Sequence, residues 1–471
     1  MSHPVGMYVV SITEMWERFS FYIFSSILVL FMMEVLHFSM EFTSFLFGII
    51  IGGTYFFQLI AGFVSDKFLG NRSAIIFGGI FMFIAQLIFM YSASLFYMTA
   101  NVPEHSAFLF SYPEIIFLVG VVVMTIGASF FKVSITSFVG LFYPDNEELI
   151  DSAYTIFYTL INVGGFLAPL ALHFVVGVND PSLYQYGFLV GAIAILIGLI
   201  IFVLFRGKLC LPNGEPVGDK PLSKTKMVIE RRKNRASDKL GKIEMDRFKV
   251  ILFILIIIIA FFIAHEQISI SFLIFTMSYV NNVIPFINIT LSPEAYLTLN
   301  PLFIILLSPI FIKISSMLSD RNKEPSSISK LGIGLYVVAF GFLTLVISFL
   351  TADSNMKIAV YWMIIFNLVL VIGELLIMPI SLSLVSKLAP PKYTSLMVGV
   401  LFASTGVAEI IAGSVASAFP DYYGETTMLL NIIPIYGVES FMWIFVILCF
   451  VFGTVWFLFR NKIKKLMHGV S

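Results

Sequence analysis

The sequence contains few charged residues. Asp, Glu, Lys and Arg make up 12% of its 471 residues, against about 25% in soluble domains. The 28 basic and 28 acidic residues balance one another, so the net charge gives no indication of a nucleic-acid partner. This scarcity of charge excludes an ordinary soluble domain. The hydrophobic share of 59% indicates a chain that crosses a membrane repeatedly.

Cysteines and catalytic motifs are also scarce. Cys210 lies in a polar stretch and Cys449 in an apolar one, so we expect neither a disulfide nor a metal site built on cysteine. The six histidines lack metal-ligand spacing, and no cofactor is expected. The sequence contains no G-x-S-x-G, no H-E-x-x-H and no carboxylate pair at catalytic spacing. These absences argue against an intramembrane enzyme.

Long hydrophobic runs, by contrast, are abundant. A membrane-spanning helix needs about 20 mainly apolar residues, and twelve segments reach that length. The first has no basic start and no small-residue cleavage site, so it is predicted to be a retained helix. The predicted spans are residues 8–36, 43–65, 73–95, 113–141, 154–177, 185–205, 249–280, 296–318, 328–350, 358–386, 394–418 and 434–459.

A polar stretch divides these spans into two sets of six. Residues 206–248 hold twelve Lys or Arg against six Asp or Glu. We predict a six-helix bundle over 1–205, a basic cytoplasmic linker over 206–248, and a second six-helix bundle with a basic tail over 249–471. Two such halves are typical of the major facilitator fold, an all-α membrane architecture whose halves rock around a midplane site.

The basic residues predict the orientation. If the N-terminus is inside, the loops on the opposite side carry a single base, Lys357. Cytoplasmic loops are enriched in Lys and Arg, so both termini and the linker are predicted to face the cytoplasm of a multi-pass cell-membrane protein. The bases on that side, apart from the linker, are Lys67, Arg72, Arg321, Lys323, Lys330, Lys387, Lys392, Arg460, Lys462, Lys464 and Lys465.

A few ionisable residues are predicted to lie at membrane depth. A charge at the bilayer centre costs about 2.5 kcal/mol or more, so such residues usually pair or face water and are functional candidates. For the first span the alternative is a position among the headgroups, and for Lys132 it is snorkelling to the interface. His265 is expected to face its neighbours. The candidates are Glu14, Glu17, Arg18, Lys132, Glu266, Glu374 and, with a structural role equally open, Glu409.

Lys132 and Glu374 carry opposite charges in different predicted halves. Their attraction requires both charges, so protonating the carboxylate would weaken the pair. A proton moving down its gradient gains about 2.3 kcal/mol per 100 mV and could drive alternation between two states. We therefore predict Lys132 and Glu374 as a gate pair. Unlike charges in the two halves also favour alternation over a passive channel.

Several motifs follow one another along nearly the whole chain. They are "EMWERFSFY" (14–22), "GTYFFQLIAGFVSDKFLGNR" (53–72), "GASFFKVSIT" (127–136), "DSAYTIFYTLINVGGFLAP" (151–169), "AHEQ" (264–267), "LNPLFIILLSPIF" (299–311) and "GELLIMPISLSLVSKLAP" (373–390). In this order they resemble the motifs of the proton-coupled oligopeptide transporter (POT/PTR) family, and the first is similar to the family's E-x-x-E-R-F-x-Y-Y signature.

The resemblance implies a monomeric proton-coupled symporter that imports di- and tripeptides by alternating access. Arg18 and Lys132 would face the peptide carboxylate. Glu374, with Asn162 and Asn300, would receive the amino group. Proton coupling is implied for Glu14, Glu17, Arg18, Lys132 and Glu266, with Glu17 beside Arg18 and Lys132 and with Glu14 in support. The implied substrate-binding residues are Arg18, Tyr22, Tyr55, Lys132, Tyr158, Asn162, Glu266, Asn300 and Glu374.

Four positions depart from the family pattern. Ser25 stands where relatives often carry a second arginine, which would pair with the glutamate of the seventh span. Phe21 replaces the first tyrosine of the signature. Met378 and Leu401 stand where serine and tryptophan are common. The implied pocket is less polar and one positive charge poorer, so the alternative is the same fold with modified peptides or small organic anions as substrate.

Overall fold

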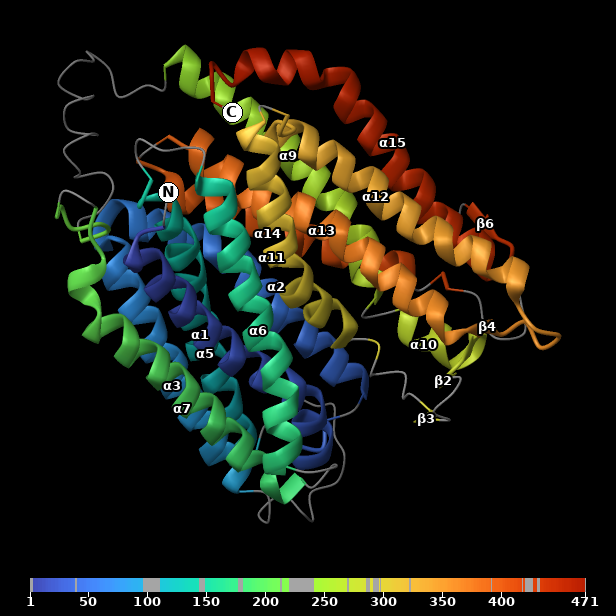
Figure 1. Cartoon of the computed structure of the whole chain (residues 1–471). Coiled ribbons are helices and arrows are strands. Elements are labelled where there is room, and N and C mark those ends of the chain that lie inside the picture. Colours follow the sequence, from blue (N-terminus) through green and yellow to red (C-terminus); the bar gives the residue numbers. More distant parts are fainter. Residues whose placement is uncertain are drawn as a thin grey trace. The chain divides into compact units, whose positions relative to one another are not determined.

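The computed structural model consists almost entirely of long helices (Figure 1). Eleven of the described helices are long and apolar enough to cross a membrane, and α1, which carries three charges, coincides with the remaining predicted span. The predicted all-α fold is confirmed. The structure describes residues 3–38, 40–95, 111–143, 149–176, 181–211, 214–219, 241–268, 271–284, 289–290, 296, 298–321, 323–390, 392–416, 418–419, 427–429 and 433–470.

The chain forms two compact units. Unit 1 comprises Met1–Lys239 and Ala389–Ala403, and unit 2 comprises Leu240–Leu388 and Ser404–Ser471. The helices of unit 1 are α1 (Val5–Leu30), continued by the π-turn η1 (Phe31–Val35), α2 (Met40–Val64), continued by η2 (Ser65–Leu69), α3 (Asn71–Ser94), α5 (Tyr112–Gly140), α6 (Ile150–Val176) and α7 (Tyr184–Leu204), with short 3-10 turns η4 (Pro181–Leu183) and η5 (Arg206–Lys208).

Unit 2 contains α9 (Lys242–His265), η7 (Glu266–Ile268), α10 (Ser271–Tyr279), α11 (Leu299–Asp320), α12 (Ser327–Ser348), η9 (Phe349–Thr351), α13 (Val360–Leu388) and α15 (Gly437–Leu466). Helix α14 (Thr394–Ala416) begins in unit 1 and ends in unit 2. Helices α12 and α15 run side by side (Figure 1). Short strands pair as β1 (Val280–Asn281) with β4 (Ile358–Ala359), β2 (Val283–Ile284) with β3 (Ile289–Thr290), and β5 (Thr427–Leu429) with β6 (Ile433–Ile435).

Glycines allow two helix pairs to pack backbone to backbone. A Cβ on Gly78 of α3 would lie 2.6 Å from the carbonyl oxygen of Gly127 on α5. In unit 2, a Cβ on Gly373 of α13 would lie 3.0 Å from the carbonyl oxygen of Gly334 on α12. Small residues at such crossings permit close helix contact in membranes. The two crossings fix the helices that carry Lys132 and Glu374.

The N-terminus of α14 is bound to unit 1 by a buried carboxylate. Asp66 in η2 accepts hydrogen bonds from the backbone N–H groups of Ser395, at 3.2 Å, and Leu396, at 2.9 Å. Asn71 donates to the carbonyl of Ser134, at 3.0 Å, and lies 3.3 Å from the Ser395 hydroxyl. A negative charge is favourable at a helix N-terminus, so Asp66 both caps α14 and holds its first turn in unit 1.

The first part of the predicted linker is ordered against α3. Arg72 donates to the carbonyl oxygens of Val217, at 2.7 Å, and Leu209, and forms an ion pair of 3.3 Å with Asp219. The middle of the predicted linker, residues 220–240, lies outside the described residues. Helix α9 begins at Lys242, seven residues before the predicted span, because Glu244 accepts the N–H of Gly241 at 2.9 Å and extends the helix.

The seventh predicted span, residues 249–280, is not one continuous α-helix. Helix α9 ends at His265, a 3-10 turn follows over Glu266–Ile268, and α10 begins at Ser271. Apolar residues dominate both sides of this change, so hydropathy could not reveal it. The change of helix type occurs between His265 and Glu266.

Candidate functional site

Unit 1 contains a cluster of two acids and two bases on α1 and α5. The guanidinium of Arg18 donates to both carboxylate oxygens of Glu17, from Nε at 2.5 Å and from a terminal nitrogen at 2.6 Å. Its Nε also lies 3.6 Å from Oε1 of Glu14, one turn earlier. A bidentate Arg–carboxylate pair is among the strongest polar contacts in proteins. The cluster therefore centres on a fixed guanidinium.

The second base of the cluster pairs with the other acid. Lys132 on α5 donates from Nζ to Oε1 of Glu14. The resemblance implied Glu17 beside both bases with Glu14 in support, whereas here Glu17 pairs with Arg18 and Glu14 with Lys132. Both acids are completely buried. Two acids and two bases balance in charge, and their mutual attraction offsets the cost of removing them from water.

Aromatic rings cover the two bases. Cζ of Arg18 lies 4.6 Å from the centroid of the Phe21 ring, and Nζ of Lys132 lies 5.6 Å from that of Phe402 in the same unit. A ring face within about 6 Å attracts a cation. Phe21 occupies a tyrosine position of the family signature, and its ring retains this contact without a hydroxyl.

Helix α6 packs closely on the charged face of α1. A Cβ on Gly164 would lie 2.3 Å from the carbonyl oxygen of Met15, so only glycine fits there. Beyond this contact α1 becomes accessible at Tyr22, which is 37% exposed, and the Ser25 hydroxyl donates to the Tyr22 carbonyl at 3.2 Å. On α6 itself, Asn162 donates to the carbonyl of Tyr158 at 2.9 Å. Tyr55 on α2 and Tyr158 are partly buried.

Unit 2 contains a second polar cluster, built from α9, η7, α11 and α13. Glu374 is almost completely buried, and its Oε2 accepts a hydrogen bond of 2.8 Å from the Asn300 amide. Nε2 of His265 lies 3.2 Å from the same oxygen, and Nδ1 lies 3.5 Å from Oε1 of Glu266. The structure thus brings together Glu374 and Asn300, which the sequence grouped, and adds a histidine between two carboxylates.

His265 is the residue of this cluster that the sequence analysis did not assign to the site. The signal that could have found it is its position directly before Glu266, deep in an apolar span. The Lys132–Glu374 pair and the grouping of Asn162 with Glu374 each take residues from both units, and they stay predictions.

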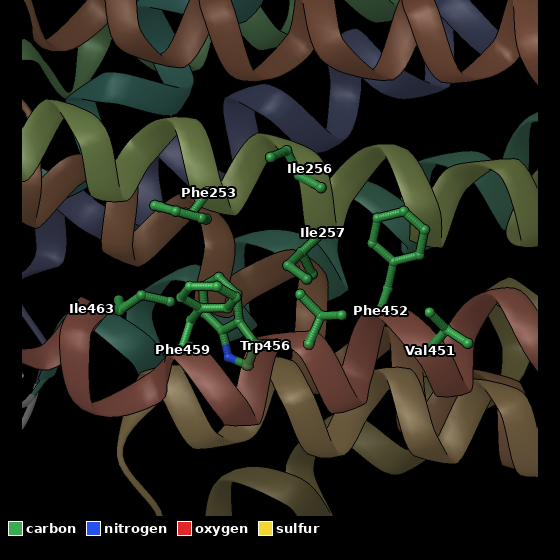
Figure 2. A pocket seen from close by; sticks show the side chains of 9 residues that line it. Phe253, Ile256, Ile257, Val451, Phe452, Trp456, Phe459 and Ile463 are labelled. Carbon is green, nitrogen blue, oxygen red and sulfur yellow. The ribbon is translucent and has the colours of Figure 1, made fainter.

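An apolar pocket lies elsewhere in unit 2 (Figure 2). It is lined by Phe253, Ile256, Ile257, Val451, Phe452, Val455, Trp456, Phe459 and Ile463 of α9 and α15. These side chains offer no charge to bind either end of a zwitterion. Among the described residues there is also no group of three His, Cys, Asp or Glu that could hold a metal ion. The two charged clusters, one in each unit, therefore remain the candidate functional residues.

The chain is similar to known transporters over its whole length. A family model described as the POT family matches residues 72–247 and 222–429. The "Uncharacterized transporter YclF" of Bacillus subtilis (strain 168) is 27% identical over 99% of this chain and 96% of its own. The "Dipeptide and tripeptide permease B" of Aliivibrio fischeri (strain MJ11) is 25% identical over 93% of this chain and 90% of its own.

A solved structure shares the fold. The crystal structure of a POT family transporter in complex with a thioalcohol conjugated peptide superimposes with a TM-score of 0.69. The two chains are 21% identical, and the match covers 98% of this chain and 97% of that one. The similarity therefore extends to both sets of helices.

Proposed function

The chain belongs to the POT family, and from that premise we propose that it imports di- and tripeptides together with protons by alternating access. It is a multi-pass membrane transporter and not an enzyme. The relatives named dipeptide and tripeptide permease support this substrate class. The observation that carries the proposal is the pair of buried polar clusters, one with two bases in unit 1 and one with Glu374 in unit 2.

A zwitterionic peptide matches this distribution of charge. Its carboxylate would bind Arg18 and Lys132, and its ammonium would bind Glu374 with Asn300 and Asn162. Charge-assisted hydrogen bonds to the two ends anchor any short peptide regardless of its side chains. Tyr22, Tyr55 and Tyr158 would line the cavity and take up varied side chains. Recognition of the ends also limits the length of the peptide.

Protons would act by releasing the two bases. A proton on Glu17 removes the bidentate partner of Arg18, which keeps only its longer contact of 3.6 Å with Glu14. A proton on Glu14 removes the partner of Lys132, because each attraction requires both charges. A released base is then available to the peptide carboxylate, or to Glu374 as the gate pair. Glu266 would be a further proton-binding group. This arrangement couples peptide binding to protonation without a cofactor.

We place the transporter in the cell membrane as a monomer, with both termini and the basic linker in the cytoplasm. The bias of Lys and Arg toward the loops on one side supports this orientation. The two helical bundles, residues 1–205 and 249–471, would act as the alternating halves on either side of the 206–248 linker.

A modified peptide or a small organic anion is the alternative substrate. It is favoured by Ser25, which leaves the site without a second arginine, and by the buried apolar side chains of Met378 and Leu401. The same coupling residues would serve either substrate. Only the recognition of the free peptide ends would differ.

Uptake into proteoliposomes tests the proposal. We expect labelled dipeptides and tripeptides to accumulate when the outside is acidified, and to equilibrate slowly without a pH gradient. Accumulation of organic anions but not of peptides would establish the alternative substrate. If neither class accumulates with the gradient imposed, the proposed symport is wrong.

A further inference from the structure

His265 lies between two carboxylates at the end of a helix. Both ring nitrogens face acids: Nε2 lies 3.2 Å from Glu374 and Nδ1 lies 3.5 Å from Glu266. Only the imidazolium form has a proton on both nitrogens and can donate in both directions. A neutral ring would direct a lone pair at one of the two carboxylates. The geometry therefore favours the charged ring as long as both acids are ionised.

The backbone favours the same charge. His265 is the last residue of α9, and a helix C-terminus carries a partial negative charge that stabilises cations. Phe261, one turn earlier, packs its ring on the imidazole with the centroids 5.1 Å apart. The titratable groups in contact with the ring, among the described residues of the surrounding helices, are Glu266 in η7 and Glu374 in α13. Asn300 on α11 is neutral and donates to Glu374.

This position is the one assigned to the peptide's amino group. Both an imidazolium and a peptide ammonium are cations that donate N–H groups to a carboxylate. Two like charges held this close in a buried site repel each other far more strongly than they do in water. An ammonium arriving at Glu374 therefore disfavours the proton on His265.

We propose that His265 is a built-in substitute for the peptide ammonium: it is protonated when the site is empty and releases its proton when a peptide binds Glu374. The proposal rests on the proposed function for its ligand. The exchange balances, because one N–H proton leaves the ring as one ammonium enters, and the charge of the cluster is unchanged. Glu374 is thus never left buried without a cation.

The proposal gives peptide affinity a defined dependence on pH. Where His265 is protonated in the empty site, each bound peptide displaces one proton from the ring. Relative to a variant without the imidazole, the Kd therefore rises about tenfold for each pH unit of acidification, separately from the effect of the two acids in unit 1. A dipeptide whose amino group is acetylated brings no ammonium and should displace no proton from the ring. This pH dependence of the Kd therefore requires a free amino group on the ligand.

NMR of histidine-labelled wild-type protein tests the empty state. We expect one of the six histidines to be doubly protonated at pH 7.5 without peptide and to become neutral in saturating dialanine. The His265→Gln variant assigns that signal. A neutral His265 ring in the peptide-free protein would overturn the inference while leaving the proposed transport function untouched.

Calorimetry in buffers of different ionisation enthalpy tests the exchange. Wild-type protein should release one more proton per dialanine than His265→Gln, and the variant should lose the tenfold change in Kd per pH unit. His468→Gln is the matched control, because His468 also lies 3.1 Å from a carboxylate, that of Asp246, in the same unit. It should behave as wild type.

The outcomes separate the two proposals. Equal proton release in wild type and His265→Gln, with dialanine bound by both, contradicts the role of His265. Absence of binding by any peptide to wild-type protein contradicts the proposed function, and the NMR of the empty state still decides the charge of the ring. If His265→Gln fails to fold, the change in the wild-type NMR signal on adding dialanine decides the exchange.

Discussion

In unit 1, Glu17 is held by the two-pronged guanidinium of Arg18, and Glu14 is held by the ammonium of Lys132. Each acid is buried and accepts hydrogen bonds from one base, so a proton on either acid breaks one of these two hydrogen-bonded ion pairs. At the scale of one residue, neutralising either acid should therefore imitate permanent protonation.

Replacing Glu17 by Gln should abolish uptake driven by a pH gradient and leave counterflow exchange measurable. The amide cannot gain or lose the coupling proton, but Arg18 remains available to the peptide. Radiolabelled dialanine uptake and exchange in proteoliposomes measure the two activities. Glu34→Gln is the control. Glu34 lies in η1, which continues α1, and its carboxylate accepts a hydrogen bond of 2.6 Å from the Tyr184 hydroxyl outside the cluster. Driven uptake by the Glu17→Gln variant would refute the assignment.

Replacing Lys132 by Ala should weaken peptide binding and driven transport together. It also leaves Glu14 buried without its base, which costs about 3–5 kcal/mol of stability. The double variant Glu14→Gln, Lys132→Ala removes that charge and should recover most of the melting temperature but no transport. Recovery of transport along with stability would reduce Lys132 to a structural role.

Replacing Ser25 by Arg should strengthen recognition of a free peptide carboxylate. Residue 25 lies three positions after the partly exposed Tyr22 on α1. An arginine at this position would supply the second base that is common in relatives. Competition by free and C-terminally amidated dipeptides measures the preference, which should shift toward the free acid by about tenfold for a gain of 1.4 kcal/mol. An unchanged preference would show that the missing base does not limit affinity.

At the scale of helices, backbone contacts position the charges. Gly164 on α6 touches the backbone of α1 at Met15, three residues before Arg18. Gly127 on α5 touches α3, five residues before Lys132. These contacts hold the two sides of the unit 1 cluster in register, so a single added methyl group should disturb it.

Replacing Gly164 by Ala should lower stability by about 1–3 kcal/mol, the usual cost of overpacking. The added Cβ would lie 2.3 Å from the Met15 carbonyl oxygen, which forces α1 and α6 apart. Thermal unfolding in detergent measures the loss. Gly413→Ala in α14 is the control, since a Cβ there meets nothing within 4 Å, and it should be neutral or slightly stabilising. Equal melting temperatures for the two variants would contradict the proposed close contact.

The sequence predicted the helices better than their details. Hydropathy located each span because an apolar run of sufficient length has one stable state in lipid. It did not reveal the break at Glu266, because the residues on both sides are equally apolar. The choice of Glu14 rather than Glu17 as the partner of Lys132 depends on how α5 packs against α1, which periodicity does not specify.

At the scale of the whole molecule, the proposed mechanism couples the flux of peptide to the flux of protons. The cluster that contains Arg18 and Lys132 belongs to unit 1 and the Glu374 cluster to unit 2, and the proposed peptide would bind charges of both. Peptide and proton would then cross together, so a gradient of either one should drive the other. A channel or a uniporter lacks this reciprocity.

The most direct test is proton influx driven by peptide alone. Proteoliposomes containing a pH-sensitive dye are prepared at equal internal and external pH, with the membrane potential clamped at zero, and dialanine is added outside. We expect internal acidification with the wild-type protein and none with the Glu17→Gln variant. Dialanine entry without any acidification would contradict proton-coupled symport.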